Sequence, residues 1–287
     1  MLIEMLNIEM NIMTRGRTPG GATREVVNTI RDCYKRFGSK SPYKVDILIA
    51  ETQSIMQDFL REEKFKFGIT NTDNECSVCS HDALRGYPRI TVSLEGLATL
   101  SKSARLGALR HESAHSVLHC SLEFRIFRIP EDSRQVALIK GIDLPVLEQF
   151  IYILAAAIMD YEASSLLVEH DFIDCQAAYA LECIQPPRRD KSTLDSAKLE
   201  RQAKFIFKTS LLQPMLLAHP ILALPKSKKI SLEKQILLGR KIEELVELVD
   251  SSEQSRLLQV SNSIADNLTS DTHHNVDAAI PQAMTLA

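Results

Sequence analysis

Residues 110–120 read RHESAHSVLHC and bring together His111, Glu112, His115 and His119. The three histidines are spaced by four residues, about one helical turn, so in a helix they lie along one stripe. No proline interrupts the surrounding segment, and Ser101 or Ser103 can cap its start. The stretch therefore predicts a helix over about residues 104–119 with its imidazoles on one face.

The His-Glu-x-x-His spacing of this helix predicts a Zn²⁺ site. Two imidazoles one turn apart, His111 and His115, can share one ion at about 2.0–2.1 Å. Glu112 points to the side of that face, where its carboxylate can reach a water on the metal rather than the metal itself. With a third ligand and an open fourth position, the expected chemistry is amide hydrolysis with Glu112 as the general base. A surface helix that carries exposed His and Glu by chance remains the alternative.

The segments before this helix alternate between helix and strand. The apolar spacing predicts a helix over residues 23–37 that stops at Gly38, and a second helix over residues 53–66. YKVDILIA, residues 43–50, predicts a strand with a buried centre. RITVSLEG, residues 89–96, alternates apolar and polar residues as a half-exposed edge strand does. The intervening residues 67–88 predict a short strand and a long loop.

The rest of the chain is predicted to be helical. Asp143 and Pro145 predict the start of a long helix. The apolar centre of this helix, residues 150–159, is too short to cross a bilayer, so we expect it in the core of the protein. We therefore expect the α+β class, with a small sheet that has an edge strand. The expected divisions are an N-terminal segment (1–22), a catalytic domain (23–185), a helical C-terminal region (186–270) and a disordered tail (271–287).

The motif at His111–His115 and the later segment MDYEASSLL, residues 159–167, together resemble the zincin metalloproteases and, within them, the gluzincin-like group. The similarity covers about residues 24–170 and extends distantly to minimal gluzincins and ImmA/IrrE-type peptidases. It implies a third, acidic ligand on the downstream helix. Aligning Ala163 with the small residue of that group places Asp160 at the ligand position, although the family usually has Glu there. Glu162 is the second candidate; the two differ by about 200° around a helix, so they cannot both face the metal.

Several other polar residues are candidates for parts of the site. His119 lies about 6 Å further along the helix axis than His115, so we expect it to contact the site or the core rather than the metal. Tyr161, His170 and His219 are candidates for an oxyanion stabiliser by residue type only, and none is assigned.

The segment CSVCSH offers Cys76, Cys79 and His81, which is half of a structural zinc site. No second pair lies nearby, so free thiols in a loop are the alternative. The chain has six cysteines in 287 residues and nothing that marks it as secreted, so free thiols are expected throughout.

Composition limits the classes of partner. The 34 Lys and Arg against 37 Asp and Glu give a net charge of −3, so we expect neither a nucleic acid nor a membrane as partner. The first apolar run of the chain contains Glu4 and Glu9, and the first cation of the chain, Arg15, comes after this run. A secretory signal has the opposite order, with its cations before the apolar run, so we expect a cytoplasmic protein.

The expected function is therefore a zinc peptidase that acts on a peptide or protein substrate. One alternative is a zincin-fold regulatory or scaffolding protein with one dedicated partner or no activity. A second alternative is a helical interaction module with an accidental motif.

Overall fold

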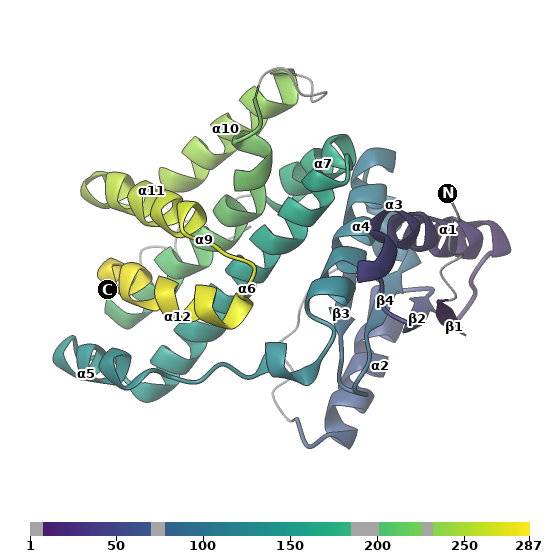
Figure 1. Ribbon diagram of the computed structural model, residues 1–287, viewed down its shortest axis with the longest axis horizontal. Coiled ribbons are helices and arrows are strands. Elements are labelled where there is room, and N and C mark those ends of the chain that lie inside the picture. The colour runs from purple at the N-terminus through teal and green to yellow at the C-terminus, as the bar shows by residue number, and fades with distance from the viewer. Residues whose placement is uncertain (1–7, 70–77, 185–200, 226–231) are drawn as a thin grey trace. The chain divides into compact units, whose positions relative to one another are not determined.

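The computed structural model describes residues 8–69, 78–184, 201–225 and 232–287. The chain divides into two compact units, one of residues 1–125 with 166–179 and one of residues 126–165 with 180–287. The predicted catalytic domain, residues 23–185, therefore includes parts of both units. The α+β class is confirmed, because one small mixed sheet accompanies helices that make up most of the described chain (Figure 1).

The N-terminal unit is built on a four-stranded sheet in the order β1-β2-β4-β3. Strands β1, β2 and β4 are parallel, and β3 is antiparallel to β4 at the edge. The strands are β1 (Glu9–Arg15), β2 (Lys44–Ala50), β3 (Cys79–Asp82) and β4 (Arg89–Ser93). The helices that begin in this unit are α1 (Gly20–Phe37), α2 (Gln53–Lys66), α3 (Leu94–Thr99), α4 (Lys102–Leu118) and α7 (Ile173–Cys183), with 3-10 turns η1 (Gly38–Lys40) and η2 (Leu122–Arg125).

The prediction that residues 89–96 form an edge strand is wrong. Strand β4 lies between β2 and β3, and all five of its residues are buried. The polar side chains of β4 alternate with apolar ones, a pattern that normally indicates an exposed face. Here the polar side chains have partners inside the protein. Thr91 shares a hydrogen bond of 2.7 Å with Ser80, and Arg89 pairs with acidic groups. The edge strand next to β4 is β3, in a segment for which a short strand and a long loop are predicted, and β1 forms the other edge.

The two faces of the sheet are covered by different helices. In the register of β3 and β4, His81 lies opposite Ile90 and Asp82 lies opposite Arg89, and successive side chains point to opposite faces. His81 stacks on a histidine of α4, whereas Arg89 binds Glu63 of α2. Helices α4 and α2 therefore lie on opposite faces, and α1 packs along α4 (Figure 1).

A group of buried charges joins α2 to the sheet. Arg89 is only 1% exposed; its guanidinium binds Asp82 at 2.9 Å and Glu63 at 2.7 Å. Arg85 and Lys66 also bind Glu63, both at 2.6 Å. Burial alone would raise the pKa of Glu63, but the hydrogen bonds from Lys66, Arg89 and Arg85 lower it to about 2. Each buried charge is thus compensated.

The C-terminal unit is helical in its described residues. Its elements are α5 (Glu131–Ile139), most of α6 (Leu144–Glu169), α9 (Arg201–Leu222), α10 (Leu232–Val246), α11 (Ser251–Asp266), α12 (Thr272–Ala283) and η3 (Met284–Leu286). Phe150 and Phe205 stack at 4.8 Å between α6 and α9. The expected core helix around residues 150–159 is confirmed, because α6 buries most of that segment.

The tail was expected to be disordered, but it forms helix α12. Its first turn is capped by Asp271, whose side chain accepts a hydrogen bond from the His274 amide. Its apolar face, with Val276 and Ile280, is buried against the rest of the unit. Tertiary packing therefore stabilises a segment whose composition alone gives little indication of helix.

Helices α6 and α9 are long and apolar enough to cross a membrane by length and composition. In both, 61% of the apolar window is buried inside the protein. Core helices of soluble proteins pass the same test, so this property is weak evidence for a membrane span.

Candidate metal centre

Helix α4 is fixed on several sides within the N-terminal unit. The Ser101 side chain accepts a hydrogen bond from the Ala104 amide, so the predicted cap is confirmed. Tyr34 of α1 and Ser116 of α4 share a buried hydrogen bond of 2.7 Å between their hydroxyl oxygens. The helix ends at Leu118, close to the predicted boundary. Because its middle turns are buried, the motif does not lie on an exposed surface helix.

The two histidines of the motif face one another at close range. His111 and His115 are 3% and 6% exposed, and their Nε2 atoms lie 3.0 Å apart. Two nitrogen ligands of one tetrahedral zinc ion are about 3.3–3.4 Å apart when each bond is about 2.0–2.1 Å long. The pair therefore needs only a small adjustment to hold one ion.

The remaining ring nitrogens of this pair are held by neighbouring side chains. His111 Nδ1 lies 3.2 Å from the Gln176 amide nitrogen, and His115 Nδ1 lies 3.0 Å from His119 Nδ1. Metal binding through both Nε2 atoms requires each Nδ1 to carry a proton. His119 Nδ1 can accept a hydrogen bond from the Nδ1–H of His115, and the Gln176 amide, turned so that its oxygen faces the ring, can accept one from the Nδ1–H of His111. Such contacts orient metal ligands and fix their tautomers.

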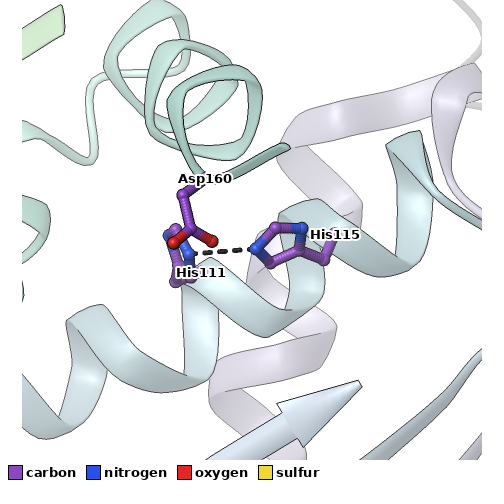
Figure 2. Close-up of side chains that lie close together, drawn as sticks. All are labelled: His111, His115 and Asp160. Carbon is purple, nitrogen blue, oxygen red and sulfur yellow. Dashed lines mark hydrogen bonds between the residues drawn. The ribbon is translucent and has the colours of Figure 1, made fainter. Parts of the chain in front are cut away.

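The third residue expected at the metal, Asp160, is grouped with the two histidines. Figure 2 shows its carboxylate beside the imidazoles of His111 and His115, and one ligand atom from each residue lies within 4.8 Å of the others. Asp160 belongs to α6, which continues without interruption to Glu169 and whose last residues belong to the N-terminal unit. Its Oδ2 also accepts a hydrogen bond of 2.8 Å from Gln213.

Glu162, the alternative third ligand, binds other groups. Its two carboxylate oxygens accept hydrogen bonds of 2.8 Å from Thr272 and Asn275, at the start of α12. Asp160 and Glu162 point in different directions from α6, because two residues separated by two positions lie about 200° apart around a helix. Accordingly, Gln213 donates to Asp160, and the two donors to Glu162 are different side chains. Glu162 thus has a structural role in attaching α12 to α6.

Glu112 lies beside the edge strand β3. It is 7% exposed, and its Oε2 lies 3.7 Å from His81 Nδ1. Burial lowers the pKa of His81 well below its usual value, and the neighbouring His115 and Arg125 lower it further. His81 is therefore neutral at pH 7, so it places no positive charge beside Glu112. A carboxylate in this setting is suited to accept a proton.

Sequence reasoning treated His81 only as part of a second metal site with Cys76 and Cys79. In the structure its ring stacks on that of His115 at 4.8 Å, with an angle of 3° between the planes. Burial and the charge of Glu112 raise the pKa of the Cys79 thiol, which opposes the thiolate form that zinc requires. Cys76 lies outside the described residues.

Two further neighbours of the motif were missed in the sequence, Gln176 and Tyr179 of α7. The Tyr179 ring lies 5.2 Å from the His111 ring. The signal that could have found them is Gly107, one turn before His111, because a glycine inside a buried helix indicates close approach of another chain segment.

The remaining candidates for an oxyanion stabiliser are Tyr161, His219 and His170. Tyr161 and His219 lie 5.9 Å apart, ring to ring, in the C-terminal unit. His170 packs on Phe37, and its backbone oxygen accepts a hydrogen bond from Arg36. All five described cysteines are free thiols, as expected.

The close contact of α4 with α7 gives a stability prediction. A Cβ on Gly107 would overlap the Cys175 carbonyl oxygen and the Tyr179 Cβ, so Gly107→Ala is expected to destabilise the protein by about 1–3 kcal/mol despite the higher helix propensity of alanine. Gly239 of α10 has open space around it, so Gly239→Ala is expected to stabilise by about 0.5–1 kcal/mol. Urea unfolding of both variants checks the contrast. Equal changes in the free energy of unfolding for the two variants would contradict the close packing of α4 on α7.

No family model, curated protein or solved structure matches this chain. The donor set of two imidazole nitrogens and one carboxylate oxygen is one of the sets that zinc takes in catalytic sites. The burial of the rings and the contacts that hold both Nδ1 atoms fit a resident metal ion.

Proposed function

We propose that this protein is a zinc-dependent peptidase that hydrolyses peptide bonds in a peptide or protein substrate. The observation that carries the proposal is the pair of buried imidazoles on α4 whose Nε2 atoms lie 3.0 Å apart while each Nδ1 is held by a neighbouring side chain. Buried histidines with a purely structural role have no need to direct two Nε2 atoms at one point. The proposal also depends on the resemblance of the motif to zincins.

His111 and His115 would hold the ion, with Asp160 as the third ligand. A zinc ion bound there supplies a Lewis acid that polarises the substrate carbonyl and lowers the pKa of a water molecule toward about 7. Asp160 suits the role because a carboxylate compensates part of the charge of the ion, and because its Oδ2 is oriented by Gln213.

Glu112 would perform the proton transfers. Its carboxylate accepts a proton from the attacking water and then donates it to the leaving amine nitrogen. Glu112 lies in a buried setting beside neutral His81, and burial favours this exchange because it disfavours the ionised form of a carboxylate. The ring of His81 also packs flat on His115 and limits its rotation.

Zinc content distinguishes the two candidate third ligands. Purified wild-type protein is expected to contain about one zinc ion per chain, and Asp160→Ala is expected to lose most of it, because two imidazoles alone hold zinc weakly. Glu162→Ala is expected to retain full zinc content but to be less stable, because Thr272 and Asn275 lose their acceptor. Metal analysis by plasma mass spectrometry, combined with thermal unfolding, measures both effects.

The opposite pattern, with zinc retained in Asp160→Ala and lost in Glu162→Ala, would show that the ligand assignment is wrong. Wild-type protein without zinc, even after incubation with the metal and dialysis, would show that the motif is accidental. His115→Ala is the reference for an empty site.

A further inference from the structure

The C-terminal unit contains a small pocket whose lining is mostly cationic. Helix α9 contributes Arg201, Lys204 and Lys208 from one face, and α11 contributes Glu253 and Arg256. Leu286 and Ala287 complete the lining, and the cavity has a volume of about 220 Å³. This is smaller than the roughly 300–1,000 Å³ typical of sites for drug-sized ligands, so the space suits a small and polar molecule.

A further cation, Lys140, lies near the cations of this pocket. Gln202 donates hydrogen bonds to the Gly141 carbonyl oxygen at 3.2 Å and to Asp143 at 3.0 Å, which ties the start of α9 to the turn that follows Lys140. Lys140 Nζ donates a hydrogen bond of 3.4 Å to a main-chain oxygen of Ala287, the last residue of the sequence. Burial lowers the pKa of Lys140, and the neighbouring charges of Arg256, Arg201 and Lys208 lower it further. Positive charge therefore accumulates at this place.

The acidic groups compensate only part of that charge. Lys208, which is 8% exposed, binds Glu253 at 2.7 Å, and Lys204 binds Asp250 at 3.7 Å. Within the described ranges, no side-chain carboxylate forms an ion pair with Lys140, Arg201 or Arg256. Lys140 is bound to Ala287, which leaves Arg201 and Arg256 as the two cations of the lining that no described side-chain carboxylate pairs. Like charges repel one another, and a bound anion would relieve that repulsion.

We propose that this pocket binds the phosphate group of a small molecule. A phosphate carries up to two negative charges at pH 7, and its oxygens match the forked donors of two arginines and the ammonium groups of the lysines. Arg201 and Arg256, one from each of the two helices, bind the oxygens from two sides. Lys208, held in place by Glu253, supplies a fixed charge in the lining. This site is independent of the proposed zinc centre.

Titration calorimetry with inorganic phosphate, at constant ionic strength, tests the proposal. The wild-type protein is expected to bind one phosphate, and Arg256→Gln is expected to weaken binding at least about tenfold, the loss of one charge-assisted pair. Arg240→Gln, at an exposed position of α10, removes the same charge outside the pocket and is expected to leave the affinity unchanged. Glycerol 2-phosphate, a phosphate monoester, serves as a second probe.

The melting temperature, measured with and without phosphate, distinguishes a phosphate-binding role of Arg256 from a purely structural role. Without phosphate, Arg256→Gln is expected to be as stable as the wild type or more stable, because a repulsive charge is removed. With phosphate, the rise in melting temperature seen for the wild type is expected to disappear. Equal affinity in Arg256→Gln and Arg240→Gln, or no binding to the wild type up to about 10 mM phosphate, would overturn the proposal.

Discussion

A chain carrying Glu112→Gln is expected to keep about one zinc ion per chain and to lose peptide hydrolysis by about 10²–10⁴-fold, the usual contribution of a general base. Glutamine has nearly the same shape as glutamate but cannot accept the proton of the attacking water. Zinc is retained because the proposed ligands are His111, His115 and Asp160, and Glu112 faces His81 instead. Cleavage of a panel of fluorogenic peptides, measured together with zinc content, checks the result.

The matched variant is His115→Ala, which is expected to lose both zinc and activity. If Glu112→Gln hydrolyses the peptides as fast as the wild type does, Glu112 is not the base. If the zinc-loaded wild type cleaves none of the peptides, the protein acts on one dedicated partner or has no activity, which is the regulatory alternative drawn from the sequence.

Arg89→Ala is expected to lower the free energy of unfolding of the N-terminal unit by about 3–5 kcal/mol. The substitution removes the guanidinium that binds Asp82 through both of its oxygens, and it removes one of the three cations that bind the buried Glu63. Arg61→Ala is the matched control, because it removes the same side chain from an exposed pair with Asp58 on α2. That control is expected to change stability by about 0–1 kcal/mol.

Urea unfolding followed by circular dichroism measures both variants. A loss in Arg89→Ala no larger than in Arg61→Ala would mean that the buried charges are solvated or compensated in another way. We also expect weaker zinc binding in Arg89→Ala, because Asp82 anchors the strand that places His81 on His115.

The helix that carries the motif was predictable, since its cap, its periodicity and the four-residue spacing of its histidines are all local features. The helix over residues 53–66 was predicted for the same reason, and α2 has those bounds. Local patterns work where the periodicity and the ends of an element agree.

The position of strand β4 was not predictable from pattern alone. An arginine and a threonine that alternate with isoleucine and valine indicate an exposed face, unless partners from distant segments compensate them. Here Glu63, 26 residues away, and Ser80 supply that compensation. Only the tertiary structure shows that the polar face of the strand is buried.

The neighbours of the two motif histidines show the same limit. His119 was expected beside the site because it lies on the same helix. Gln176 lies 65 residues from His111 in sequence, and no local spacing relates the two. Segments from distant parts of the chain supply most of the groups that orient the imidazoles.

The N-terminal unit is discontinuous along the chain, because residues 166–179 complete what residues 1–125 begin. During synthesis on the ribosome, the motif helix emerges well before the α7 segment that supports it, with the whole of residues 126–165 produced in between. The first unit cannot finish folding until that later piece has left the exit tunnel. A nascent or truncated polypeptide that stops at residue 125 would therefore contain both imidazoles and the glutamate, yet lack the residue that orients His111.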